Sequence, residues 1–237
     1  FFQFDPMTIK LAHDQVISMF KNAIDKEFDK RTSSNTEIKQ LIMCLIRKGI
    51  INEKGKDNFK KEQNGESRIS VQYNGDPYDG ILTKLGGGVA LNALEHKIIN
   101  ITGSTSIKAD QLKNILIFND DKKILQSKDE PNSWIMIDFK NNTVSISGYS
   151  IRSHSSFGKN KMHLLSWNIE GSNDSENWDL IDSHKDDRLL EDSSINTFAV
   201  KNQKYYKYIR IIQTDKNSLN KNHLVISSFE LFGWVKF

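Results

Sequence analysis

Histidine and cysteine are the residues of this sequence best suited to bind a metal ion or to act as catalysts. The chain has one cysteine, Cys44, so neither an internal disulfide nor a paired-thiolate metal site can form. The six histidines do not recur at the spacings that zinc sites use: they are His13, His96, His154, His163, His184 and His223. His154 and His163 bracket one polar loop, where we expect a solvent-exposed pair rather than a metal site.

The hydroxyl and carboxyl side chains are not arranged as in an enzyme. No Gly-x-Ser-x-Gly turn presents a nucleophile, and the 30 acidic residues form many chance pairs, none of which stands out. Two Asp-rich stretches, 119–121 and 185–187, offer oxygen ligands but lack the alternating pattern of a dedicated calcium loop. We therefore expect a protein that is not an enzyme and has no cofactor, with one structural calcium ion as the open alternative.

The composition indicates an ordinary folded protein. Hydrophobic residues make up 37% of the 237 residues and charged residues 27%, a balance typical of globular chains. The net charge of +3 is too small and too evenly spread to predict nucleic-acid binding, and no run of 18 apolar residues predicts a membrane span. A single cysteine favours a reducing, intracellular compartment, here the cytoplasm or its cytoskeleton. The start at Phe1 suggests a fragment of a longer protein.

The second half of the chain carries the pattern of an antiparallel β-sandwich. Residues 134–139 alternate strictly, with Ile135, Ile137 and Phe139 on one face, as a half-buried strand requires. The opposite face then carries Trp134, Met136 and Asp138. Further short strands are predicted at the spacing of a sandwich, over residues 97–103, 115–118, 144–152, 166–171, 178–184, 197–200, 207–213 and 224–232.

The first 50 residues instead show a helical period. Apolar residues recur every three or four positions, at Ile9, His13, Val16, Phe20, Ile24 and Phe28. A second helix is predicted over residues 36–48, closed by Gly49. We therefore expect a helical segment over residues 1–50, a polar linker over 51–75 and a β domain over 76–237.

Several short motifs of the β domain together resemble one family. They are Trp134-Ile135, Asp138-Phe139, 149–153 (Tyr-Ser-Ile-Arg-Ser), 166–174 (Ser-Trp-Asn-Ile-Glu-Gly-Ser-Asn-Asp), Trp178 and Tyr208-Ile209-Arg210. In this order they resemble the discoidin-like domain, also called the coagulation-factor type C or galactose-binding-like domain, in the form found behind BTB and BACK domains of intracellular proteins. The resemblance covers residues 76–237. It implies a β-sandwich jelly roll that binds ligands with the loops at one end and does no chemistry.

The resemblance extends more weakly to the start of the chain. By order and length, residues 1–50 look like the tail of a BACK-type helical domain. That implies a BTB dimerisation domain further upstream, and with it a homo-oligomer formed through sequence that precedes Phe1.

The resemblance also places the ligand site in four loops, over residues 103–106, 119–123, 153–163 and 214–221. The candidate binding residues in and beside these loops are Asn119, Arg152, His154, Phe157, Lys159, Lys161, His163 and Lys216. Arginine and histidine there are suited to hydrogen-bonding a sugar hydroxyl or an acidic protein surface, and Phe157 is the aromatic residue available for stacking on a sugar ring. Away from the loops, we expect a structural ion pair for Arg210 and packing roles for Trp167 and Trp178.

We therefore expect a non-catalytic docking or recognition module of an intracellular BTB-type scaffold or adaptor, with a protein partner or larger assembly as its ligand. A carbohydrate-binding, lectin-like module is the first alternative, and a structural component buried inside a large assembly is the second. Glycan binding by residues 76–237 would favour the lectin. Capture of a defined protein partner without a sugar signal would favour the scaffold.

Overall fold

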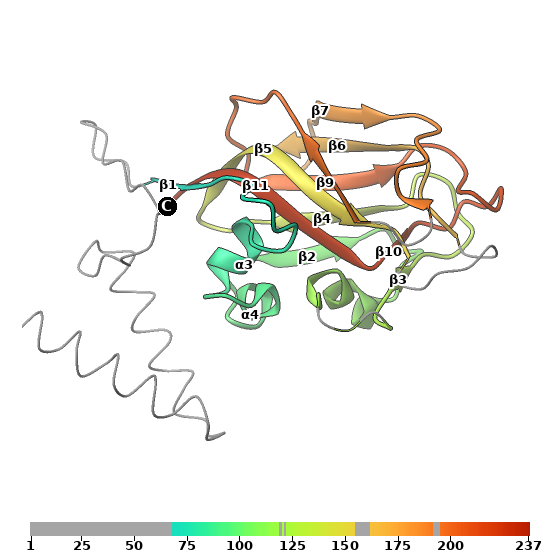
Figure 1. The fold of residues 1–237 in the computed structure, drawn as a ribbon, viewed down its shortest axis with the longest axis horizontal. Helices are drawn as coiled ribbons and strands as arrows, with labels where there is room; N and C mark the ends of the chain where they lie inside the picture. Colours follow the sequence, from blue (N-terminus) through green and yellow to red (C-terminus); the bar gives the residue numbers. More distant parts are fainter. Residues whose placement is uncertain (1–67, 119, 121, 155–161, 192–194) are drawn as a thin grey trace, which may run out of the picture. The chain divides into compact units, whose positions relative to one another are not determined.

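The computed structural model describes residues 68–118, 120, 122–154, 162–191 and 195–237 of the chain. These residues form the β-sandwich predicted from the strand pattern, with short helices beside it (Figure 1). The helices expected within residues 1–50 lie outside the described residues. Within the range expected to be a linker, residues Arg68–Val71 form the first strand, β1.

Two antiparallel sheets form the layers of the sandwich. The five-stranded sheet has the order β2 (Asn100–Gly103), β4 (Trp134–Asp138), β9 (Tyr208–Gln213), β6 (Trp167–Ser172), β7 (Asp179–His184). The four-stranded sheet has the order β1, β11 (Ser228–Lys236), β5 (Thr143–Arg152), β8 (Ile195–Ala199). A two-stranded ribbon pairs β10 (Val225–Ile226) with β3 (Leu125–Gln126). The fold class predicted from the sequence is confirmed.

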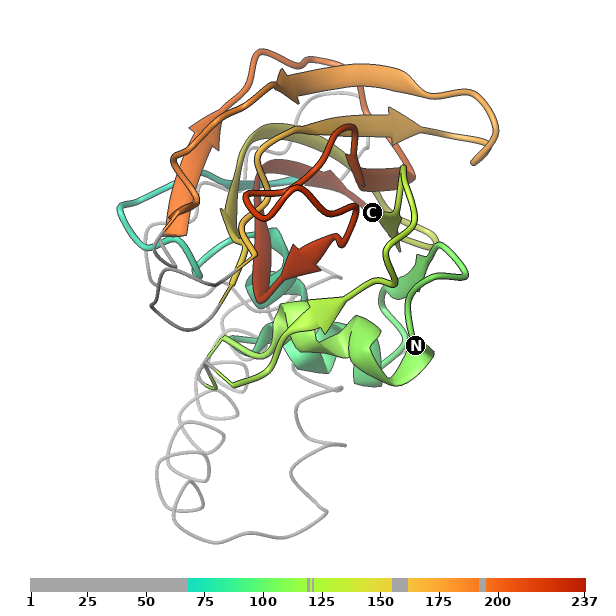
Figure 2. The ribbon, with the colours of Figure 1, turned by 90° about the vertical axis from the view of Figure 1, so that its right-hand side faces the viewer.

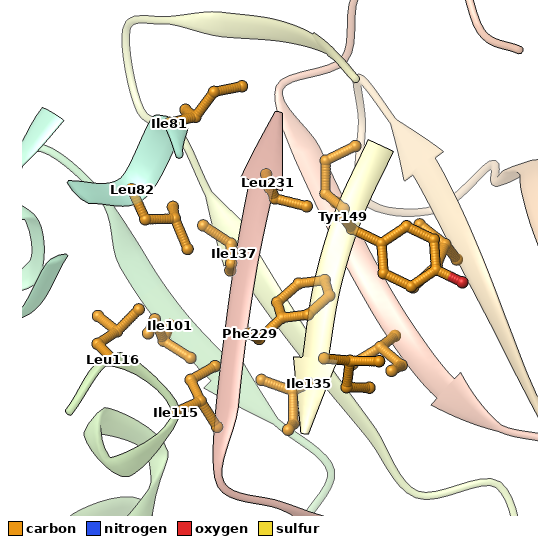
Figure 3. Packing of buried hydrophobic residues seen from close by; sticks show 14 of the residues in the cluster. Ile81, Leu82, Ile101, Ile115, Leu116, Ile135, Ile137, Tyr149, Phe229 and Leu231 are labelled. Carbon is orange, nitrogen blue, oxygen red and sulfur yellow. The ribbon is translucent and has the colours of Figure 1, made fainter. Parts of the chain in front are cut away.

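The interior between the two sheets is filled by apolar side chains from alternate strand positions. Ile135 and Ile137 of β4, and Phe139 just after it, are at most 2% exposed, which confirms the face predicted from the alternation. Tyr149 of β5 and Phe229 of β11 are equally buried and lie in the same cluster of side chains (Figure 3). Burial of each such side chain is worth about 1.5–3 kcal/mol, so this cluster holds the two layers together.

Three short helices lie beside the sheets: α3 (Ile81–Leu85), α4 (Ala90–Glu95) and the 3₁₀ helix η1 (Ala109–Leu116). Helix α3 packs against β11, η1 against β11 and β2, and α4 against the other two helices. The strand predicted over residues 115–118 is wrong, because Ile115 and Leu116 form the buried end of η1. A run of four adjacent apolar residues fits a strand or a buried helix end equally well. The strand predicted over residues 224–232 divides at Ser227 into β10 and β11.

Glu230 of β11 joins the four-stranded sheet to helix α3. Its carboxylate accepts hydrogen bonds from the backbone N–H groups of Leu82 (2.8 Å) and Thr83 (3.0 Å) and from the Thr83 hydroxyl (2.8 Å). The first N–H groups of a helix lack partners within the helix, so a carboxylate satisfies them well. Gly80 makes this approach feasible, since a Cβ added there would lie 2.4 Å from the Glu230 Cγ.

A chain of hydrogen bonds runs from the core to the edge strand β7. The Trp167 indole N–H donates to the Tyr149 hydroxyl (3.0 Å), which donates to Asp182 (2.8 Å). Burial raises the pKa of Tyr149 far above its ordinary value, so the hydroxyl stays protonated. The His184 ring stacks on Trp167 with 4.3 Å between centroids, and its nitrogens lie 3.0 Å from Asp182 and 2.6 Å from Asp187. His184 therefore has a structural role.

Candidate functional site

Strand direction brings three of the four predicted loops to one end of the sandwich. Strands β2, β5 and β9 end there, whereas β4, β6 and β11 begin there. This end is on the right in Figure 1 and faces the viewer in Figure 2. We call it the loop end, and its described residues are 104–107, 127–133, 152–154, 162–166 and 214–227.

Hydrogen bonds fix the loops of this end against one another. The backbone N–H of Ser218 donates to the His163 carbonyl (3.0 Å), and the His163 N–H donates to the Ser218 hydroxyl (2.9 Å). The buried Ser153 hydroxyl donates to the Val225 carbonyl (2.9 Å) and accepts from the Leu164 N–H (2.7 Å). The bonds between His163 and Ser218 join positions 55 apart, and that between Ser153 and Val225 joins positions 72 apart, so the described loop residues form one ordered surface on a rigid scaffold.

A further segment, residues 127–133, belongs to the loop end and was not among the four predicted loops. Asp129 accepts hydrogen bonds from the backbone N–H (2.7 Å) and the side chain (3.0 Å) of Asn222. The backbone bond from Asn222 holds the pKa of Asp129 below its ordinary value. The signal was available, because this segment immediately precedes strand β4, which begins at the loop end.

The described candidate residues differ in their surroundings. Arg152, the last residue of β5, is half-buried, and its Nε donates to the Ser227 hydroxyl (3.0 Å). The rings of His154 and His163 come within 6.4 Å of each other, centroid to centroid. His163 is only 5% exposed, so the expectation of a solvent-exposed pair is wrong. Lys216 is exposed to solvent. The remaining candidates lie outside the described residues: Asn119, Phe157, Lys159 and Lys161.

The fourth predicted loop, 119–123, is described only at residues 120, 122 and 123. Its described residues follow Phe118, whose ring stacks on Tyr78 at 4.8 Å, just before helix α3. The backbone N–H of Lys123 closes a local turn onto the Asp120 carbonyl (3.2 Å). The hydrogen bonds of its described residues are therefore local to the loop.

Two expectations for residues outside the loops are confirmed. Arg210 pairs with Glu170 on the neighbouring strand at 2.6 Å, as expected of a structural ion pair. Trp167 is fully buried in the core. Trp178 packs across the sheet surface, with the Arg210 guanidinium 3.9 Å from its ring centroid.

The described residues contain neither a cluster of metal-binding side chains nor a membrane-spanning helix. Within them, no group of three or more His, Cys, Asp and Glu side chains is placed to hold a metal ion. In the same part of the chain, no helix is long and apolar enough to cross a bilayer.

The fold and the loop end are those of a ligand-binding sandwich domain, and comparison with known families agrees. The profile of the F5/8 type C domain matches residues 100–227, which is more than half of the 237 residues. The chain belongs to this family.

Two curated relatives are named as ubiquitin ligases. The chain is 26% identical over 169 residues to E3 ubiquitin-protein ligase Ufd4 of Drosophila melanogaster, a match over 66% of this chain and 6% of the relative. It is 31% identical over 142 residues to E3 ubiquitin-protein ligase hecd-1 of Caenorhabditis elegans, over 58% of this chain and 5% of the relative. The chain thus spans a small fraction of their length. Neither name supports the expected BTB and BACK setting.

Among solved structures, similar folds occur in carbohydrate-binding modules. The module CpGH89CBM32-5 from Clostridium perfringens, in complex with GalNAc-β-1,3-galactose, has a TM-score of 0.47 and 14% identity, covering 59% of this chain and 98% of the module. A pectin-binding carbohydrate-binding module has a TM-score of 0.43 and 19% identity, covering 56% of this chain and 89% of the module.

Proposed function

We propose that the described sandwich is a non-catalytic recognition domain that binds a protein partner at its loop end. The mutual hydrogen bonds of Ser218 and His163, which join two loops into one surface, carry this proposal. A sandwich of this kind holds its end loops on a rigid frame, so their side chains can meet a partner with little loss of conformational entropy.

The larger protein around this domain is proposed to act in ubiquitin transfer. Both curated relatives are named E3 ubiquitin-protein ligases, and the matched region is 5–6% of each. A domain of this size within a ligase is suited to hold a substrate or an accessory protein. This setting replaces the BTB scaffold expected from the sequence.

A carbohydrate ligand is the alternative, and the described loop end favours it less. Stacking of a sugar ring needs an accessible aromatic side chain. The described loop segments 104–107, 127–133, 153–154, 162–166 and 214–227 contain no Phe, Tyr or Trp. A polar surface without these aromatic side chains is better suited to a protein partner than to a sugar ring.

The experiment captures partners on the immobilised full chain and compares two charge reversals. Lys216→Glu alters the loop end, whereas Lys201→Glu alters an exposed lysine after β8, at the opposite end of the sandwich. We expect that a partner protein captured by wild type is also captured by Lys201→Glu but is not captured by Lys216→Glu. Equal capture by both variants would overturn the proposed site. A glycan array that binds the full chain, in the absence of any captured protein, would favour the carbohydrate alternative.

A further inference from the structure

Arg152 holds a half-buried positive charge that the described part of the chain leaves without an acidic partner. Its Nε donates to the Ser227 hydroxyl at 3.0 Å. Its Nη2 is shielded from solvent and makes no hydrogen bond with the described residues. Two other described arginines are neutralised, since Arg210 pairs with Glu170 at 2.6 Å and Arg188 with Glu191 at 2.9 Å.

A second unpartnered group lies directly across the strand pair. Ser228 of β11 is the register partner of Arg152, is 1% exposed, and its hydroxyl is also buried without a hydrogen bond. Buried polar groups are nearly always paired in folded proteins, and leaving one unpaired costs about 1–3 kcal/mol. Two such groups on opposed residues indicate a site that is completed by a group outside the described residues.

Carboxylates are scarce in the stretches of sequence that flank Arg152 and Ser228. Residues 140–169 contain no Asp or Glu, although the chain has 30 acidic residues in all, and residues 216–229 contain none either. Glu230, two residues further along β11, already accepts hydrogen bonds on both oxygens, from Leu82 and Thr83. Among the described residues, the charge of Arg152 therefore has no carboxylate partner.

We propose that Arg152, supported by Ser227 and Ser228, binds a carboxylate of an acidic segment in the partner protein. The inference rests on the proposed function, because it names the chemistry by which that partner is recognised at the loop end. A planar guanidinium binds the two oxygens of a carboxylate through two parallel hydrogen bonds. One guanidinium beside neutral hydroxyls matches the single charge of a carboxylate better than the nearly double charge of a phosphate monoester.

The test follows the arginine N–H signals of the ¹⁵N-labelled full chain by NMR at low salt. The probes are acetylated hexaglutamate amide, the matching hexaglutamine peptide and inorganic phosphate. We expect hexaglutamate to shift the Arg152 Nε–H signal, and hexaglutamine to leave it in place. Phosphate at the same concentration should shift it less. An Arg152 signal that hexaglutamate does not move, or that phosphate moves more, overturns the proposal.

Two variants then test whether hexaglutamate binds at Arg152 or is attracted by the positive charge of the protein in general. Arg152→Lys keeps the charge but loses the paired hydrogen bonds, so hexaglutamate should bind about tenfold more weakly. The control Arg188→Lys makes the same exchange at an exposed arginine and should bind like wild type. Equal affinity of both variants overturns the proposal. The wild-type titration holds even if Arg152→Lys fails to fold.

The two proposals fail in different ways. If Lys216→Glu abolishes capture of a protein partner while hexaglutamate leaves Arg152 unmoved, the carboxylate site is wrong and the loop-end function stands. If Arg152 binds hexaglutamate but the captured partner is unaffected by Lys216→Glu, the carboxylate site stands and the loop-end function is wrong.

Discussion

Replacing Glu230 by glutamine should change how the stability of the sandwich depends on pH. Glu230 is 1% exposed, and its carboxylate accepts four hydrogen bonds, from Leu82, Thr83 (twice) and its neighbour Leu231. Burial nevertheless dominates and raises the pKa of Glu230 from 4.5 to about 7. Glutamine has nearly the same shape and does not titrate, so it isolates the contribution of the proton.

The sign and size of the effect follow from linkage. Because the folded-state pKa is the higher one, the folded state binds the proton more tightly than the unfolded state. The resulting stability is fully present below pH 4.5 and is lost as pH rises through 7. A difference of about 2.5 pKa units corresponds to about 3 kcal/mol. Between pH 4.5 and pH 8, the free energy of unfolding of wild type should therefore fall by about 3 kcal/mol relative to that of Glu230→Gln.

Urea unfolding followed by tryptophan fluorescence measures this difference. All four tryptophans lie in the described sandwich, at Trp134, Trp167, Trp178 and Trp234. Other titrating groups are present in both proteins, so their contributions cancel in the difference between the two free energies of unfolding. Any effect of the amide that does not depend on pH leaves the pH dependence of this difference unchanged. A wild-type minus variant difference that does not change with pH would refute the reasoning. A difference of the opposite sign would mean that the hydrogen bonds outweigh burial.

Three further predictions concern the same sandwich. Gly80→Ala should lower the free energy of unfolding by about 1–3 kcal/mol, because the added Cβ meets the Glu230 Cγ; an unchanged urea midpoint would contradict this. A double-mutant cycle of Trp178→Ala and Arg210→Met should give a coupling of about 0.5–1 kcal/mol, and additive effects would show that the stacked pair contributes nothing. His184→Phe keeps a ring on Trp167 but removes both nitrogens, so unfolding should become about 1–3 kcal/mol easier. A urea midpoint equal to that of wild type would show that the hydrogen bonds of the His184 nitrogens do not contribute to stability.

The layered fold could be predicted because its signal is local. Alternation over residues 134–139 placed Ile135 and Ile137 inside, and β4 has this face buried. Helix α3 could not be predicted in this way, because it has five residues and its N–H groups are satisfied by Glu230, 148 positions from Leu82. Local sequence does not encode such a contact.

The loop end was only partly predictable for the same reason. Strand order, taken from the resemblance, brought residues 103–106, 153–163 and 214–221 to one end. The link between Asp129 and Asn222 spans 93 positions, so no nearby pattern indicated it. The burial of His163 likewise depends on packing between two loops, and its sequence neighbours suggested an exposed residue.

Site-specific photo-cross-linking tests the central claim most directly. p-Benzoylphenylalanine replaces Lys216 at the loop end or Lys201 at the opposite end, in the full chain, and each protein is irradiated with the captured partner. We predict a cross-link from position 216 and none from position 201. A cross-link from position 201 alone would contradict it.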